Sequence, residues 1–202
     1  MMSASARQRT CQLFETGFIE RFSRIHPATP FVFWVPVIAW RVWVAARAGV
    51  TAPAIVGLAL AGAFVWTLAE YSLHRWVFHW TGPRPFQQRL HFIVHGVHHD
   101  FPDDAQRLVM PLGLSVPIGA AFYLLFRPLL GPALVDAFFA GFVLGYLAYD
   151  GTHWAVHHRT MKSRIGKWLK RYHMIHHHVG SRARWGVSSP LWDWVFGTME
   201  PS

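Results

Sequence analysis

Cysteine is almost missing from this sequence, and charged residues are few. Cys11 is the single cysteine, which excludes a disulfide framework and any metal site built on thiolates. Charged residues make up 14% of the chain, whereas soluble globular domains average about 25%. The 52% hydrophobic content and the 11 tryptophans therefore favour a membrane protein over a soluble one.

Acidic residues are scarcer than basic ones: 10 Asp and Glu against 19 Lys and Arg give a formal net charge of +9. A strongly basic chain is typical of proteins that bind nucleic acid. Here the basic residues flank apolar runs, so we expect the anionic face of a lipid bilayer as the partner, and no nucleic acid. Residues 1–28 have no apolar core, so no cleavable signal peptide is expected.

Four apolar runs are long enough to cross a bilayer, because about 20 apolar residues in a helix span the ~30 Å hydrocarbon core. The runs cover residues 31–50, 52–70, 108–126 and 131–149. Short connections at 47–53 and 127–132 pair them into two hairpins. Arg41 and Arg47 interrupt the first run, and we expect their long side chains to extend to the membrane surface. Asp136 is the one acidic residue of the fourth run.

The basic residues predict the orientation. All but three of the 19 Lys and Arg residues lie on the side that holds the N-terminus and the histidine clusters, so this side is expected to be cytoplasmic. The abundance of Ala, Arg and Trp favours a bacterial inner membrane over the endoplasmic reticulum. We predict an all-α integral membrane protein: four transmembrane helices in two hairpins under a cytoplasmic, histidine-rich helical cap that holds a dimetal site.

At 202 residues the chain suits one domain. We expect a cytoplasmic N-terminal arm over residues 1–30 and a single membrane-embedded domain over residues 31–202. The cap of that domain comprises residues 71–107 and 150–202.

Histidine is the residue in excess. All but His26 of the 14 histidines lie between positions 74 and 178. On a helix, residues i, i+3 and i+4 share a face, so histidines with that spacing aim several imidazoles at one point. Such an accumulation favours metal ligation over isolated structural histidines. Four clusters are present: His74 and His79; His91, His95, His98 and His99; His153, His157 and His158; and His173, His176, His177 and His178.

Helical spacing separates the histidines expected to bind metal from those that point elsewhere. His153 and His157 share a helical face, whereas His158 points about 140° away. The cluster at 173–177 repeats the arc of residues 95–99, and His178 falls off that arc.

His74 and His79 diverge by about 140° on a straight helix, which allows them to reach two different metal ions. One ion takes four to six ligands, so some ten converging imidazoles suit two ions. A structural zinc site is closed at four ligands, and a zinc hydrolase needs three ligands and a water. An all-nitrogen dinuclear site at a membrane surface instead suits oxygen activation, for which iron is the expected metal. Zinc binds the same imidazoles.

A basic amphipathic helix is expected after residue 160. Ile165, Trp168, Leu169 and Tyr172 share one face, opposite basic residues between 162 and 171. The basic face suits anionic lipid headgroups, an ordinary solvated surface, or an acidic redox partner, and the sequence does not choose among these.

The order of the histidine clusters and the residues that flank them resemble those of a known protein family. The stretches are Glu70–His79, His95–Asp100, Arg107–Pro111, Tyr149–His153 and Trp185–Thr198. Together they cover roughly residues 60–198 and resemble the fatty acid 2-hydroxylase branch of the sterol desaturase/fatty acid hydroxylase superfamily.

The resemblance implies a four-helix membrane base under a cytoplasmic cap, with two metal ions per chain. It implies ten ligands: His74, His79, His95, His98, His99, His153, His157, His173, His176 and His177. No catalytic residue beyond these ligands is expected. We expect four further residues to support them from behind: His91, Asp100, Asp150 and His158. The cytochrome b5 domain fused to the eukaryotic relatives is missing, so electrons are expected from a separate protein of the cytochrome b5 or ferredoxin type.

The expected function is a membrane monooxygenase that uses O2 to hydroxylate the α-carbon (C2) of a long fatty acyl chain, free or within a ceramide-like lipid. One alternative is a related enzyme that acts on a carotenoid or a sterol. Another is a membrane metal transporter or store, although that class needs ligands inside the membrane and the apolar runs contain no histidine.

Overall fold

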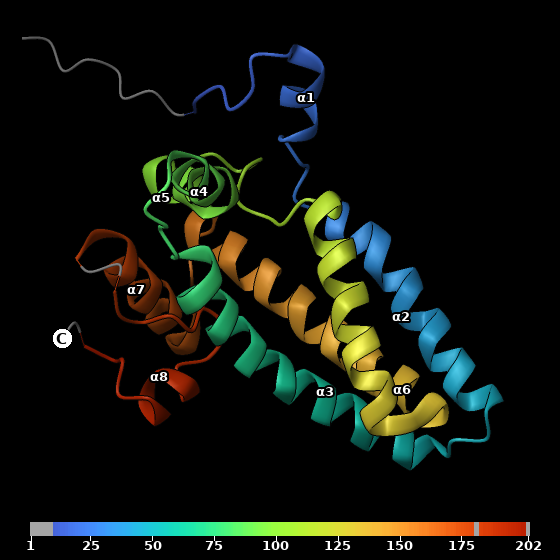
Figure 1. Cartoon of the computed structure of the whole chain (residues 1–202). Helices are drawn as coiled ribbons and strands as arrows, with labels where there is room; N and C mark the ends of the chain where they lie inside the picture. The colour runs from blue at the N-terminus through green and yellow to red at the C-terminus, as the bar shows by residue number, and fades with distance from the viewer. Residues whose placement is uncertain (1–9, 180–181, 201–202) are drawn as a thin grey trace, which may run out of the picture.

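The computed structural model describes residues 10–179 and 182–200, and all regular elements of that part of the chain are helical (Figure 1). Residues 1–9 of the expected N-terminal arm, and residues 180–181 and 201–202 of the expected cap, lie outside it. Two of the short elements, η1 and η2, are π-helices. The elements are α1 (Gly17–Phe22), α2 (Thr29–Arg47), α3 (Ala52–Ser72), η1 (Leu73–Phe78), α4 (Pro85–His91), η2 (Phe92–Gly96), α5 (Val97–Asp100), α6 (Leu112–His158), α7 (Arg164–His178) and α8 (Leu191–Val195).

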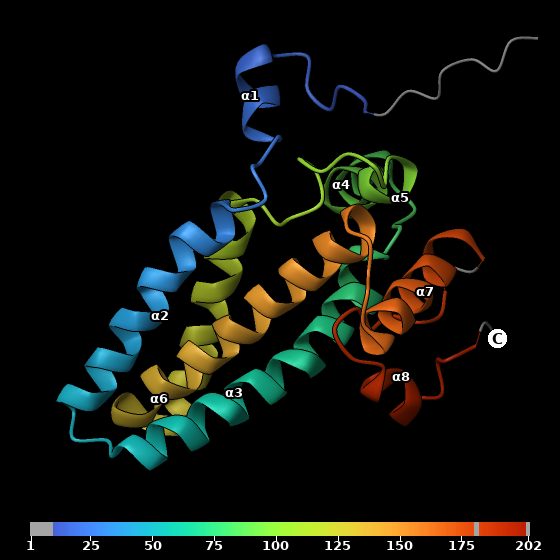
Figure 2. The same cartoon turned by 180° about the vertical axis from the view of Figure 1, so that it is seen from behind.

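The helices form a bundle and a cap. Helices α2, α3 and α6 lie side by side, and the short helices with α7 gather at one end of them (Figures 1 and 2). Within the described residues, three helical stretches are long and apolar enough to cross a membrane: Thr29–Arg47, Ala52–Phe78 and Leu112–His158.

Helix α6 turns back on itself. At Gly131 the backbone has φ +75° and ψ 166°, a conformation that glycine adopts without steric cost. The two arms on either side of it run next to each other, one coloured yellow and the other orange (Figure 1). The reversal is tighter than the connection expected at 127–132, because residues 127–130 remain helical. The first arm also begins at Leu112 rather than at residue 108.

The helices of the bundle extend directly into the cap. The second arm of α6 continues to His158, nine residues beyond the expected end of the fourth span, so His153 and His157 stand on the same helix as that span. Similarly, α3 runs into η1 without a loop. The metal-ligand candidates are therefore fixed to the bundle through continuous helices.

Glycines let α3 and α6 approach closely. A Cβ atom on Gly62 would lie 2.0 Å from the carbonyl oxygen of Phe138, and one on Gly141 would lie 1.9 Å from that of Ala59. Small residues at such crossings are a common device of membrane helices. Beside this crossing, Trp66 packs against Phe142 with ring centroids 5.2 Å apart.

Arg41 does not extend to the membrane surface as expected. Its Nη1 atom lies 2.8 Å from Oδ1 of Asp136, and its guanidinium lies 4.3 Å from the ring centroid of Tyr123. Asp136 is only 4% exposed, and a buried carboxylate without a partner costs several kcal/mol. Arg41 of the first expected span and Asp136 of the fourth thus neutralise each other between α2 and α6.

We expect Gly141→Ala to destabilise the bundle by about 1–3 kcal/mol, because the added methyl group has to displace the backbone of α3. The matched control is Gly57→Ala, also in the bundle, where a Cβ atom meets nothing within 4 Å. Thermal unfolding in detergent measures both variants. Equal stability of the two variants would contradict the close approach.

Candidate metal centre

The structure brings the ten expected ligands together in two groups of five. In each group the candidate ligand atoms all lie within 4.8 Å of one another. Neighbouring Nε2 atoms are 3.0–3.1 Å apart in the first group and 2.9–3.0 Å apart in the second. Nitrogens bonded to one ion at about 2.0–2.1 Å have separations of this order. The first group is His74, His79, His95, His99 and His176, and the second is His98, His153, His157, His173 and His177.

The two His-x-x-His-His motifs interlock the groups. The motif at 95–99 gives its i and i+4 histidines to the first group and its i+3 histidine to the second. The motif at 173–177 does the opposite: His173 and His177 belong to the second group and His176 belongs to the first. His99 and His177, one from each group, stack with ring centroids 4.1 Å apart. The groups therefore adjoin and depend on the same two helical segments.

The divergence expected for His74 and His79 is wrong. Both belong to the first group because η1 is a π-helix, in which the amide of His79 donates to the carbonyl of His74 at 3.2 Å. This i→i+5 pattern brings residues five apart onto one face, whereas an α-helix separates them. The wider turn thus aims both imidazoles at the same point.

Backbone carbonyls fix the protonation of two imidazoles in the first group. His74 donates from Nδ1 to the carbonyl of Trp185 at 2.5 Å, and His176 donates from Nδ1 to the carbonyl of Ala183 at 2.7 Å. With the proton on Nδ1, each Nε2 atom presents a lone pair to its group. Ligand histidines in metalloproteins are typically oriented in this way.

The second group contains buried nitrogens without partners. Both ring nitrogens of His98 and both of His153 are buried and lack a hydrogen-bond partner. A buried polar atom without a partner costs free energy. A bound cation would satisfy these atoms, so the donor set and its burial both fit a metal ion.

Burial also lowers the pKa of the histidines in the two groups and keeps their imidazoles neutral. It is the main cause that lowers the pKa of His99 to about 3, and the nearby His176 lowers it further. Burial and neighbouring imidazoles likewise lower the pKa of His95 and of His98. These side chains are uncharged at physiological pH and do not have to lose a proton before they bind a metal.

Three of the residues expected to support the ligands form no hydrogen bond to the ten histidines within the described part of the chain. His91 donates from Nδ1 to the carbonyl of Phe78 at 2.6 Å, and its ring lies 6.3 Å from that of His79. Asp100 is exposed, and His158 packs against Trp154 outside both groups.

Carboxylates do not orient the ligands as expected. Within the described part of the chain, neither Asp100 nor Asp150 hydrogen-bonds one of the ten histidines, and no other carboxylate does so; Asp150 is a buried residue of α6. The backbone carbonyls of Trp185 and Ala183 perform the role expected of these acids, because the chain after α7 folds back over the first group.

Two buried acids hold that returning segment. Glu70, on α3, accepts hydrogen bonds from the amides of Val187 and Ser188 at 2.7 and 2.8 Å, and from the hydroxyl of Ser188. Asp193 accepts from the amides of Trp185 and Gly186 at 2.9 and 2.7 Å. Asp193 was not predicted as a functional residue. The signal that pointed to this segment was its place in the stretch Trp185–Thr198.

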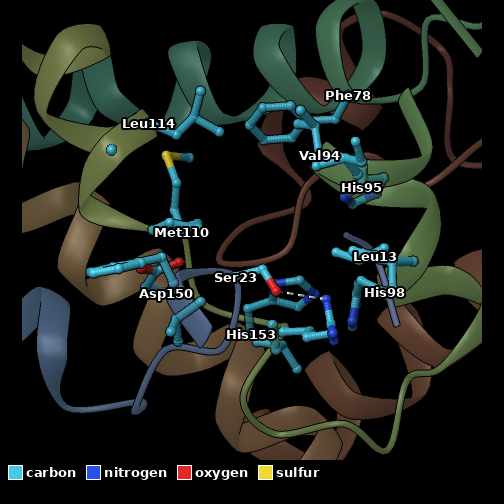
Figure 3. Close-up of a pocket in the computed structure, with 18 of the residues that line it drawn as sticks. Leu13, Ser23, Phe78, Val94, His95, His98, Met110, Leu114, Asp150 and His153 are labelled. Carbon is cyan, nitrogen blue, oxygen red and sulfur yellow. Dashed lines mark hydrogen bonds between the residues drawn. The ribbon is translucent and has the colours of Figure 1, made fainter. Parts of the chain in front are cut away.

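A cavity of about 320 Å³ reaches both groups. This volume lies at the low end of the range of about 300–1,000 Å³ for ligand pockets. His95 of the first group and His98 and His153 of the second contribute to its wall. Met110 and Leu114 lie across the cavity from His95 and His98 (Figure 3). Most of the remaining lining is apolar, so the cavity suits a hydrocarbon chain next to the histidines.

The N-terminal arm forms one side of this cavity through Leu13, Phe14, Ile19 and Phe22. Arg107 holds the arm: it donates to the carbonyl of Cys11 at 2.8 Å and pairs with Glu20. The described part of the arm is therefore an integral part of the cap.

Comparison with known proteins places this geometry in a family. The model of the family described as fatty acid hydroxylase matches residues 59–198. A dihydroceramide fatty acyl 2-hydroxylase of Arabidopsis thaliana is 37% identical over 83% of this chain and 71% of that protein. A ceramide very long chain fatty acid hydroxylase of Saccharomyces cerevisiae is 40% identical over 86% of this chain and 47% of that protein.

A solved structure shows the same fold. It is full-length scs7p with only the hydroxylase domain visible, and it superposes with a TM-score of 0.86 at 37% identity, covering 92% of this chain and 70% of that one. The family match spans every one of the ten histidines. The chain therefore belongs to the fatty acid hydroxylase family.

Proposed function

We propose that the protein is a membrane monooxygenase that hydroxylates the C2 carbon of long-chain fatty acyl groups, free or within ceramide-like lipids, with O2 as co-substrate. The observation that carries this proposal is the apolar cavity whose wall includes histidines of both groups. The relatives are named as hydroxylases of ceramide or dihydroceramide fatty acyl chains, which supports the same substrate class here.

Two metal ions, one in each histidine group, complete the proposed site. Iron is the expected metal for the reaction, and zinc fits the same nitrogen ligands. When bound, the metal pair supplies the activation of O2 that insertion into an unactivated C–H bond requires. The ten neutral imidazoles supply the ligands, and the carbonyls of Trp185 and Ala183 keep two of them oriented.

The cavity positions the acyl chain. C2 lies next to the carbonyl group, at the boundary between a polar head and an apolar tail. Met110, Leu114 and Phe22 offer apolar contacts to the tail, while His95 and His98 lie across from the first two (Figure 3). Apolar walls also keep bulk water from the reacting carbon.

We propose that the membrane base has four transmembrane helices in two hairpins: α2 with α3, and the two arms of α6. The turn at Gly131 supports the second hairpin. Residues 1–30 are the arm and residues 31–202 are the single membrane-embedded domain, with the cap in the cytoplasm of a bacterial cell, on the side where the Lys and Arg residues concentrate.

The reaction needs an external reductant. Insertion of one oxygen atom from O2 leaves the other as water and consumes two electrons and two protons. We propose that a separate protein of the cytochrome b5 or ferredoxin type delivers the electrons. The basic residues of α7, such as Lys167 and Arg171, are exposed and adjoin the histidines of that helix.

Lipid analysis of an expressing strain tests the proposal. Cells with the wild-type protein are expected to accumulate 2-hydroxy acyl chains, whereas cells with the His98→Ala variant, which lacks a candidate ligand, are not. Oxygenated carotenoids or sterols with unchanged 2-hydroxy acyl chains would overturn the substrate assignment. Metal uptake that depends on His98 without any hydroxylated lipid would support a transporter instead.

A further inference from the structure

Helix α8 presents an apolar edge that no described residue covers. Trp194 is 73% exposed, and Val195 and Phe196 are each about half exposed. The one charged residue of α8, Asp193, faces inward and is 0% exposed. The outer edge is therefore uncharged as well as apolar, which is unusual for a water-facing surface of a cap.

Helix α8 lies beside the part of α3 that crosses the membrane. The indole of Trp192 donates to the hydroxyl of Thr67 at 2.8 Å, and its ring lies 5.9 Å from that of Phe64. Phe64 and Leu60, one turn apart on α3, are both exposed and belong to its apolar span. Helices α3 and α8 contact each other, and in both views α8 lies below α7, alongside the upper part of α3 (Figures 1 and 2).

We propose that α8 inserts into the interfacial layer of the lipid bilayer, with Trp194, Val195 and Phe196 in contact with lipid. Phe64 on the exposed stripe of α3 lies against Trp192, and Trp192 in turn stacks on Phe196 of this edge, so one lipid surface covers both. Tryptophan and other aromatic side chains are enriched at this depth. This inference goes beyond the proposed function: it rests on α3 spanning the membrane, and not on the hydroxylase activity.

The insertion connects the bilayer to the first histidine group. Asp193 of α8 holds the amide of Trp185, and the carbonyl of Trp185 orients His74. The segment that touches lipid is therefore the segment that supports a candidate metal ligand. Anchoring α8 in the bilayer restricts the movement of that support.

Spin labels on single cysteines test the insertion in vesicles of phosphatidylethanolamine and phosphatidylglycerol. Cys11→Ser provides the background, and Trp194→Cys places a label on the edge. Leu60→Cys on α3 is the lipid-exposed reference. Leu90→Cys on α4 is the matched cap control, because Leu90 is an exposed apolar residue far from α8. Power saturation with O2, which concentrates in lipid, and with a water-soluble nickel chelate reports the surroundings of each label.

The ratio of O2 to nickel accessibility at position 194 is expected to exceed that at 90 several-fold and to approach that at 60. Val195→Cys repeats the measurement in case the first variant does not fold. A ratio equal to that at position 90 would overturn the proposal. Exclusion of both reagents would overturn it too, because that result indicates a protein partner, such as a second copy of the chain, on the edge.

Discussion

Replacing His153 and His157 together by alanine is expected to reduce the bound metal from two ions per chain to about one and to abolish hydroxylation. Both histidines come from α6 and belong to the second group. The first group takes no ligand from α6, so its five imidazoles stay in place. Metal analysis of the purified protein measures the ion that remains, and lipid analysis of the expressing cells measures the product.

The reciprocal variant removes His74 and His79, which serve only the first group. It is also expected to keep about one ion and to lose activity. His158→Ala is the control, because His158 lies on α6 but outside both groups, and it is expected to keep both ions. Loss of all metal in either double variant would contradict two separately filled sites. Full metal content in both would contradict the ligand assignment.

The sequence indicates which histidines lie close together because helical spacing is a local property. The two groups contain the ten histidines that the family resemblance indicated, and His158 and His178, which the spacing set aside, lie outside them. The spacing alone had kept His91, and the role of the ten as metal ligands stays a prediction. The assignment of each histidine to a group was not predictable in this way. It depends on how α5, α6 and α7 meet in space, which the spacing within one helix does not contain.

The π-helices were not predictable from α-helical spacing. An arc drawn at 3.6 residues per turn separates His74 from His79, whereas the wider turn of η1 brings them together. A π-turn is rare, and it persists where surrounding contacts compensate for it. Those contacts come from distant parts of the chain, such as Trp185, and no local propensity reports them.

The membrane helices, too, were predictable only in part. Its apolar runs were visible in the sequence, and three described helices have the required length and composition. The pairing of Arg41 with Asp136 was not visible, because the residues lie 95 positions apart. Each of these charged residues interrupts an apolar run when the sequence is read alone, but together they form one neutral ion pair when α2 packs against α6.

Among residues other than the expected ligands, Glu70 is the one whose replacement we expect to change stability and metal affinity most. Glu70→Ala leaves the buried amide of Val187 and the two partly buried donors of Ser188 without an acceptor, and a buried donor without a partner costs about 1–3 kcal/mol. Because the freed segment carries the carbonyl that orients His74, we expect the first group to bind its metal about 10–100-fold more weakly. Thermal unfolding and metal titration of the purified protein measure the two effects.

Two control variants separate this effect from a simple change of charge. Glu70→Gln keeps an oxygen that accepts from both amides, so it is expected to keep most of the stability and of the metal affinity. Glu200→Ala removes an acid whose pairing with Arg184 is exposed, and exposed ion pairs contribute about 0–1 kcal/mol. If Glu70→Ala lost stability but bound both metals as the wild type does, Glu70 would support only the fold. Weakened binding confined to the first group, with the second group unchanged, is the result that identifies Glu70 as a positioning residue for His74.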